Sequence, residues 1–176
     1  MKVLVVYESM YGNTRTIAEA IGSGLGADTE VLPVREASPE RVASADLLVV
    51  GGPTHVRGMS RPSSRKAARD AAGKPATTLT LEPGADGIGL REWFASLGTV
   101  SCRAAAFDTR IDIAAIFAGR AAPRIARLLR QHGAQLVAPP HSFLVDKQNH
   151  LLDAEPARAH AWGEDLARAA SGQRIS

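Results

Sequence analysis

Three short segments of the chain are rich in the residue types that hold phosphate groups and other polar ligands. They are residues 8–14 (Glu-Ser-Met-Tyr-Gly-Asn-Thr), residues 51–58 (Gly-Gly-Pro-Thr-His-Val-Arg-Gly) and residues 108–110 (Asp-Thr-Arg). Each follows an apolar run that is typical of a strand buried in a parallel sheet. Because ligands bind beyond the carboxyl ends of the strands in open α/β sheets, we expect the three segments to line one site.

The first segment leads directly into a predicted helix, so its backbone N–H groups and the positive end of the helix dipole converge in front of it. Ser9 and Thr14 add hydroxyl groups, Asn13 adds an amide, and Gly12 permits close approach of a ligand to the backbone. These features predict a phosphate cradle, with a simple turn and helix cap as the alternative. The segment lacks the Gly-Lys-Ser/Thr of a Walker loop and the three spaced glycines of a dinucleotide fingerprint.

The elements that must position these segments alternate between strand and helix. Apolar runs predict strands at 3–7, 29–34, 45–50, 101–107 and 135–145, and helical spacing predicts helices near 13–25, 63–72, 90–97, 119–132 and 155–170. Pro139-Pro140 indicates that the last strand is bent or lies at an edge. The pattern predicts one α/β domain over residues 1–176, a doubly wound parallel sheet with helices on both faces. The long polar loop at 73–88 has either a functional role or none.

Composition excludes several classes of protein. The net charge is +3, but no run of five or six basic residues indicates specific nucleic-acid binding. No stretch approaches the roughly 18 apolar residues of a membrane span, and the N-terminus lacks signal-peptide features, so we expect a cytoplasmic protein. The single cysteine, Cys102, excludes an internal disulfide and is expected to be a buried apolar residue. No Cys/His pair has the spacing of metal ligands, so no metal site is predicted.

Residues 5–21, Val-Val-Tyr-Glu-Ser-Met-Tyr-Gly-Asn-Thr-Arg-Thr-Ile-Ala-Glu-Ala-Ile, resemble the signature of the flavodoxin family. The positions that carry the resemblance are Tyr7, Ser9, Gly12, Thr14, Ala18 and Ile21. The resemblance implies a flavodoxin-like five-stranded parallel sheet of order 2-1-3-4-5. It also implies a flavin mononucleotide (FMN) cofactor whose phosphate is held by Ser9, Met10, Tyr11, Gly12, Asn13 and Thr14.

The second segment is similar to the family's flavin-binding segment, in which a Pro-Thr pair is followed by an aromatic residue and a glycine. The resemblance implies that the isoalloxazine ring lies along Pro53, Thr54, His55, Val56, Arg57 and Gly58. His55 stands where many relatives have Tyr or Trp. Because an imidazole covers less of the ring than an indole would, we expect the flavin to be more open to a substrate.

The third segment, Asp108, Thr109 and Arg110, occupies the position of the family's loop over the other face of the flavin, but no aromatic residue follows the strand end. Asp108 is able to accept a hydrogen bond from the pyrimidine N–H, and Arg110 is able to place positive charge near the N1/O2 edge. Such a cation would favour the anionic reduced flavin and so raise the reduction potential of the flavin. In the alternative interpretation, Asp108 caps the next segment and Arg110 is a surface residue.

The family resemblance implies an FMN-dependent redox protein, with no catalytic residue predicted and its status as an enzyme left open. It is either an electron carrier for a partner protein or an NAD(P)H:quinone reductase, and a flavin-free phosphate-sensing or interaction module is the alternative of another class. The basic residues near the second segment favour an acidic partner protein or an anionic small-molecule acceptor, or else form a solvated helix face; they are Arg57, Arg61, Arg65, Lys66 and Arg69. The oligomeric state is left open.

Overall fold

The computed structural model describes residues 1–55, 58–75 and 77–172, and its centre is a parallel β-sheet. Strands β1 (Val3–Tyr7), β2 (Thr29–Pro33), β3 (Leu47–His55) and β5 (Arg103–Ile111) lie in the order β2-β1-β3-β5. Two further strands, β6 (Gln135–Leu136) and β7 (His141–Val145), both pair in parallel with β5. The predicted order 2-1-3-4-5 is therefore confirmed, and the predicted interruption at Pro139-Pro140 divides the fifth strand into β6 and β7.

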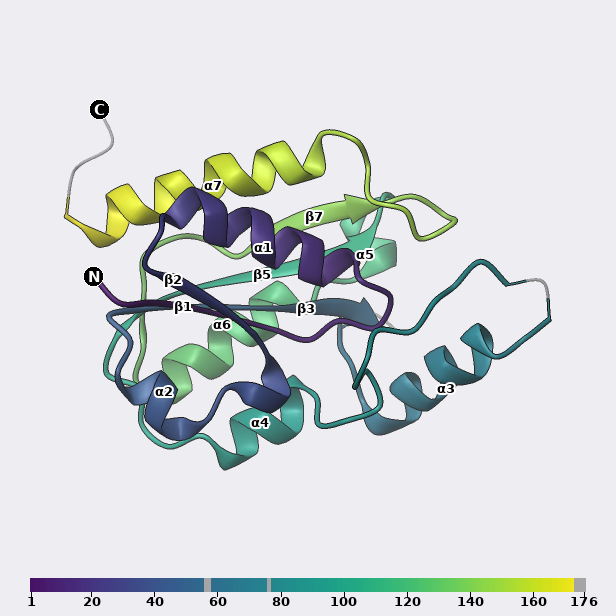
Figure 1. The fold of residues 1–176 in the computed structure, drawn as a ribbon, viewed down its shortest axis with the longest axis horizontal. Helices are drawn as coiled ribbons and strands as arrows, with labels where there is room; N and C mark the ends of the chain where they lie inside the picture. The colour runs from purple at the N-terminus through teal and green to yellow at the C-terminus, as the bar shows by residue number, and fades with distance from the viewer. Residues whose placement is uncertain (56–57, 76, 173–176) are drawn as a thin grey trace.

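Helices cover both faces of this sheet (Figure 1). On one face lie α1 (Asn13–Leu25) and α7 (Glu155–Ala170). On the other lie α2 (Pro39–Ala43), α4 (Leu90–Ser96) and α6 (Ala122–Gln131), together with the 3₁₀ turn η1 (Val34–Glu36). The two faces have separate apolar cores, since alternate residues of each central strand point to opposite sides of the sheet.

Helices α1 and α7 pack against each other, and their close approach depends on two glycines. A Cβ atom on Gly24 would collide with the carbonyl oxygen of His160, and one on Gly163 would collide with the carbonyl oxygen of Ile21. Trp162, the neighbour of Gly163 in α7, belongs to the apolar core on that face.

The central strands are longer than the sequence analysis predicted, so residues 51–55 and 108–110 are strand residues and not loops. Strand β1 ends opposite Gly51, and beyond that point β3 pairs with β5 on one side only, with Pro53 opposite Thr109. Proline lacks a backbone N–H, and it is tolerated here because Pro53 itself pairs with β5 alone. The carboxyl edge of the sheet therefore lies further along the chain than predicted: β3 ends at His55 and not at residue 50, and β5 ends at Ile111 and not at residue 107.

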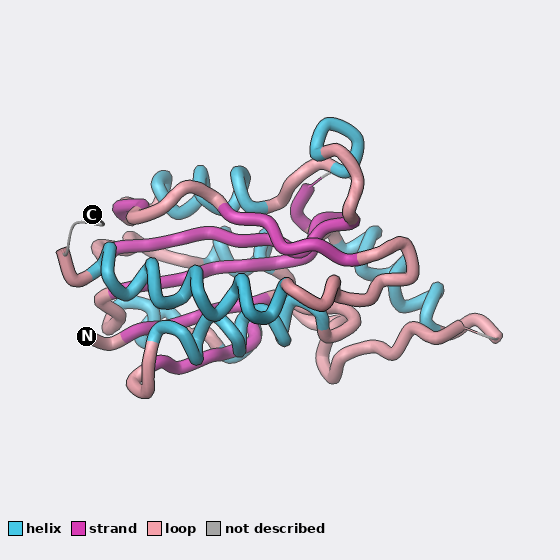
Figure 2. The backbone as a smooth tube through the Cα atoms, turned by 90° about the horizontal axis from the view of Figure 1, so that it is seen from above, coloured by secondary structure: helices cyan, strands magenta, loops and turns pink. Residues whose placement is uncertain are grey.

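Helix α3 (Pro62–Ala72) lies beyond the carboxyl ends of the strands and not on a face of the sheet (Figure 1). The short strand β4 (Gly58–Met59) leads into it and pairs antiparallel with the end of β3. Figure 2 shows α3 and the long loop that follows projecting from this end of the molecule. Among the described residues, no helix has the length and apolar character needed to cross a membrane.

Candidate functional site

The loop between β1 and α1 presents the amino end of a helix to the carboxyl edge of the sheet. Gly12 has φ of 94°, a left-handed conformation that favours glycine, and its N–H donates to Ser9 Oγ at 3.1 Å. In this described part of the chain, the first turn of α1 has no side-chain cap and contains no acidic residue. An anion in front of the helix would therefore meet backbone donors and the positive end of the dipole, with no acidic side chain of the first turn competing for them.

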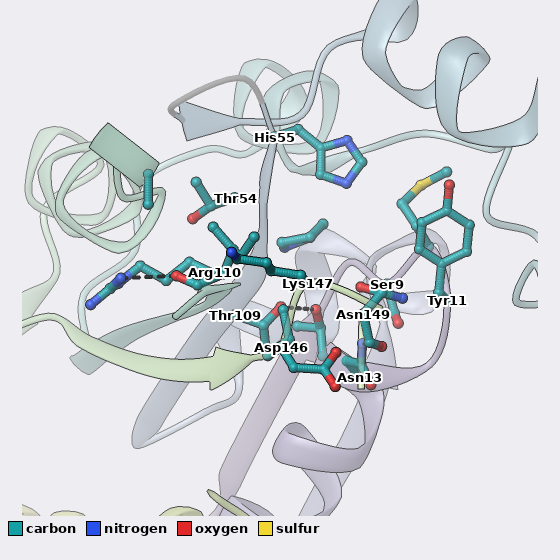
Figure 3. A pocket seen from close by; sticks show the side chains of 16 residues that line it. Ser9, Tyr11, Asn13, Thr54, His55, Thr109, Arg110, Asp146, Lys147 and Asn149 are labelled. Atoms are coloured by element: carbon teal, nitrogen blue, oxygen red, sulfur yellow. Dashed lines mark hydrogen bonds between the residues drawn. The ribbon is translucent and has the colours of Figure 1, made fainter. Parts of the chain in front are cut away.

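A cavity of about 220 Å³ lies in front of this loop (Figure 3). It is bounded by the β1–α1 loop, the ends of β3 and β5, the α5 segment, and the loop after β7. Its lining residues are Ser9, Met10, Tyr11, Asn13, Thr14, Pro53, Thr54, His55, Thr109, Arg110, Ile111, Ala118, Val145, Asp146, Lys147 and Asn149. The structure thus brings all three of the predicted segments to one place.

Three hydrogen bonds hold the first segment to distant parts of the chain. The buried hydroxyl groups of Thr14 and Thr109 are 2.7 Å apart, and they join the first turn of α1 to the end of β5. Asn13 Nδ2 donates to the Asn149 carbonyl at 2.7 Å, and the Tyr11 hydroxyl donates to the Ala68 carbonyl in α3 at 2.8 Å. These side chains therefore fix the shape of the loop and of the cavity wall.

The long loop after α3 packs against the outer side of the first segment. The Glu82 N–H donates to the Met10 carbonyl at 2.8 Å, and Arg35 Nη1 donates to the Pro83 carbonyl at 3.0 Å. The Glu82 carboxylate lies 3.5 Å from the Arg15 guanidinium. The loop therefore supports the β1–α1 turn from outside the cavity. The sequence analysis had left its role open.

At the end of β3, Pro53, Thr54 and His55 line the cavity, and they do so from a strand and not from a loop. The Thr54 hydroxyl accepts from the Ala121 N–H at 3.0 Å and so positions the segment before α6. Burial lowers the pKa of the half-buried His55, and the nearby charge of Arg65 lowers it further, so the imidazole is neutral at neutral pH. Gly58 lines a neighbouring cavity instead, while Val56 and Arg57 lie outside the described residues.

At the end of β5, Thr109 and Arg110 reach the cavity but Asp108 does not. Asp108 is fully buried, and its Oδ2 accepts from the Ala122 N–H at 2.8 Å at the start of α6. The interpretation in which Asp108 meets a ligand is therefore replaced by the capping alternative. Arg110 Nη1 donates to the carbonyl groups of Ile111 and Ile113, at 3.1 and 2.8 Å. These bonds hold the guanidinium group at the rim of the cavity (Figure 3).

The sequence analysis missed the loop after β7, which supplies Asp146, Lys147 and Asn149 to the cavity. Asp146 Oδ1 accepts from the N–H groups of Gln148 and His150, both at 2.8 Å, and Asn149 has φ of 67°. These bonds lower the pKa of Asp146 and hold it ionised within its own turn. The polar Asp-Lys-Gln-Asn sequence directly after the fifth strand was the available signal, since that strand ends at the same edge of the sheet.

The segment between β5 and α6 also differs from expectation. Because β5 continues to Ile111, the following connection begins there and includes the short helix α5 (Ala115–Ala118). Ile116 and Phe117 on this helix are 79% and 66% exposed, and the next residue, Ala118, lines the cavity. An aromatic residue does follow the strand end, ten positions beyond the expected end at Phe107.

The predicted cluster of basic residues is largely neutralised. Arg65 is buried and its Nη2 lies 3.1 Å from Glu92, Lys66 pairs with Asp70 at 2.8 Å, and Arg69 lies 3.6 Å from Asp86. Arg57 lies outside the described residues, and of the described members of the cluster only Arg61 forms no ion pair.

Cys102 is half-buried against the apolar core, and burial raises the pKa of its thiol. It is therefore not a reactive thiolate.

Comparisons with known proteins agree with this architecture. The family model described as Flavodoxin matches residues 5–81. A flavodoxin of Aquifex aeolicus (strain VF5) is 41% identical over 59 residues, which are 31% of this chain and about a third (32%) of that protein. The family model spans the N-terminal part of the chain, from β1 to the loop after α3, and supports the flavodoxin family for this part.

Solved structures extend the likeness of fold to the whole chain. A flavodoxin from the domain Archaea aligns with a TM-score of 0.64 and 22% identity, over 97% of this chain and 99% of that one. Oxidised flavodoxin 1 of Bacillus cereus aligns with a TM-score of 0.62 and 16% identity, over 100% of both chains. The flavodiiron core of Flv1 from Synechocystis sp. PCC6803 aligns with a TM-score of 0.62 and 17% identity, over 99% of this chain and 37% of that one. The fold is flavodoxin-like.

Proposed function

Because its N-terminal part matches the flavodoxin family and its fold is flavodoxin-like, we propose that this chain binds FMN and serves in electron transfer. The family implies a flavin cofactor. The observation that carries the proposal for FMN is the open amino end of α1, which faces a cavity walled by the ends of β3 and β5. When bound, FMN supplies the redox chemistry, and the protein supplies its binding and local electrostatics.

The donor groups at the first segment fit a phosphate. The candidates are the backbone N–H groups of the first turn of α1, the hydroxyl group of Ser9 and the ammonium group of Lys147. The one carboxylate in the cavity wall, Asp146, accepts from two backbone N–H groups of its own turn, and their dipoles offset part of its negative charge. Charge-assisted hydrogen bonds to an oxyanion are the strongest that a protein makes, and they would dominate the affinity.

The flavin ring would lie along Pro53, Thr54 and His55, with Gly58 and the neighbouring Val56 and Arg57 as further predicted contacts. A neutral His55 adds no charge beside the ring, whereas Arg110 places a cation at the rim of the cavity. Asp108 serves instead as a positioning residue for the start of α6. Phe117, exposed and adjacent in sequence to the cavity wall, is available to cover the ring or to contact a redox partner.

Reductive titration of the FMN-loaded protein tests this proposal and separates its versions. An electron carrier takes up two electrons in separate one-electron steps and is not reduced directly by NAD(P)H. A quinone reductase is reduced by NAD(P)H in a single two-electron step. Failure of FMN to bind at micromolar concentration would instead support the flavin-free module and would refute the proposal.

A further inference from the structure

Next to the candidate flavin site lies a second cavity, of about 400 Å³, with an unusual concentration of positive charge. We call it the arginine cavity. Its lining residues are His55, Gly58, Met59, Arg61, Ser63, Ser64, Arg91, Arg120 and Arg124. Four of these nine residues carry a guanidinium group and none carries a carboxylate. His55 lines both cavities, so the two sites share a wall.

The two half-buried arginines of this cavity are held rigidly by neutral groups. Arg91 Nε donates to the Ser60 carbonyl at 2.7 Å, and its Nη2 donates to the Met59 carbonyl at 3.1 Å. Arg120 Nε donates to Ser142 Oγ at 3.0 Å, and its Nη2 donates to the Pro140 carbonyl at 2.8 Å. These bonds fix the guanidinium groups without neutralising their charge.

No ion pair compensates the cavity within the described part of the chain. The ion pairs found there involve none of Arg61, Arg91, Arg120 and Arg124. The nearby carboxylate of Glu92 is bound by Arg65 and by the Gly89 N–H, and that of Glu8 is bound by Ser60 and the Leu90 N–H.

Like charges repel across the cavity. Burial lowers the pKa of Arg91, the charges of Arg124 and Arg61 lower it further, and the charges of Glu92 and Glu8 offset only part of this lowering. Holding unpaired cations together costs stability, and this cost is offset when an anion binds between them.

Helix α3 adds to the positive potential because it begins at this cavity. It starts at Pro62, contributes Ser63 and Ser64 from its first turn, and has no acidic residue in that turn. Helix α6 also begins here and contributes Arg124, but its amino end is already capped by the buried Asp108 carboxylate, which accepts from the Ala122 N–H. The positive end of the α3 dipole therefore reinforces the guanidinium groups.

We infer that the arginine cavity binds a small organic molecule that carries two or more phosphate or carboxylate groups. Guanidinium groups match both oxyanions through paired hydrogen bonds, and four of them call for more than one negative group. A concave site of this volume suits a small molecule better than the flat surface of a partner protein. The shared wall at His55 places the rest of the molecule beside the first cavity. Its use as an electron donor or acceptor rests on the proposed function, whereas its binding does not.

Calorimetric titration of the full chain at low ionic strength tests this inference. The probes are inorganic pyrophosphate for the phosphate class and citrate for the carboxylate class, with acetate as a singly charged reference. At least one polyanion is expected to bind about tenfold or more tighter than acetate, and whichever binds tighter identifies the class. If neither polyanion binds tighter than acetate, the inference is overturned.

Variants locate the site. Arg61→Ala and Arg124→Ala each remove an exposed side chain and are expected to weaken polyanion binding about tenfold. Arg127→Ala is the matched control: it lies three residues further along α6, is exposed and does not line the cavity, and its effect is expected to be below about twofold. An equal loss in the Arg127 and Arg124 variants would show unspecific charge attraction and would overturn the inference.

A variant of the first cavity separates the two sites. Lys147→Ala removes the ammonium group that the candidate phosphate cradle offers, so polyanion binding that persists in it and is lost in the Arg61 and Arg124 variants belongs to the arginine cavity. The reverse pattern would assign the probe to the cradle and refute the inference. Because the titrations need no flavin, a failure of FMN binding leaves their result intact.

Discussion

The hydrogen bond between Thr14 and Thr109 joins the first turn of α1 to the end of β5, and its removal gives a quantitative prediction. The two hydroxyl oxygens are 2.7 Å apart, and the residues are only 2% and 5% exposed. Thr14→Val keeps the size of the side chain but leaves the Thr109 hydroxyl buried without its partner. Leaving a buried polar group unsatisfied costs about 1–3 kcal/mol, so we expect the free energy of unfolding to fall by that amount.

Urea unfolding of a double-mutant cycle measures this contribution. Thr109→Val should cost a similar amount, and the double variant should cost less than the sum by about 1 kcal/mol or more, because both polar groups are then absent. Thr16→Val is the control: Thr16 is exposed, its hydroxyl donates to the Gly12 carbonyl at 3.2 Å, and its replacement should change stability by no more than about 0.5 kcal/mol. Strictly additive effects of Thr14→Val and Thr109→Val would refute the reasoning.

Two further predictions concern packing and pH. Gly163→Ala places a Cβ atom against the Ile21 carbonyl, whereas the Cβ of the control variant Gly98→Ala meets open space. We expect Gly163→Ala to be less stable than Gly98→Ala by about 1–3 kcal/mol in urea unfolding. Equal stability of the two variants would contradict the close packing of α1 and α7. The pKa of His55 is lowered from 6.5, so the unfolded chain binds its proton more readily and stability falls as pH drops through and below that value. His55→Gln should lose less stability than the wild type between about pH 7.5 and about pH 5.5, and identical losses would count against a buried neutral imidazole.

The order of the sheet and the place of the first segment were predictable because they depend on local patterns. The apolar run from Val3 to Tyr7 forms β1, and the segment with helical spacing of Ile17 and Ile21 forms α1. The Gly12 turn between them needs only a glycine in a left-handed conformation, which the sequence displays directly.

The ends of the central strands were not predictable, because they depend on pairing between segments distant in sequence. Gly51 and Pro53 normally end a strand, but β5 supplies a partner as far as Pro53, and the strand continues to His55. The same extension moves Asp108 from the cavity to the buried start of α6. Tertiary context therefore overrides the local turn signals at this edge.

The arginine cavity could not be predicted from the sequence, because it too depends on the packing of segments that are distant in sequence. Its guanidinium groups come from residues 61, 91, 120 and 124, on three separate segments, and the clustered basic residues that the sequence does display are mostly paired with carboxylates. Only the packing of α3, α4 and α6 at the end of the sheet brings the four together.

The most direct test of the central claim compares FMN with riboflavin, which differs only by lacking the phosphate. Titration followed by flavin fluorescence should give one FMN site per chain of micromolar or tighter affinity. Riboflavin should bind about a hundredfold more weakly, the loss expected for two charge-assisted hydrogen bonds. Equal affinity for the two flavins, or no binding of either, would contradict a phosphate cradle at residues 9–14.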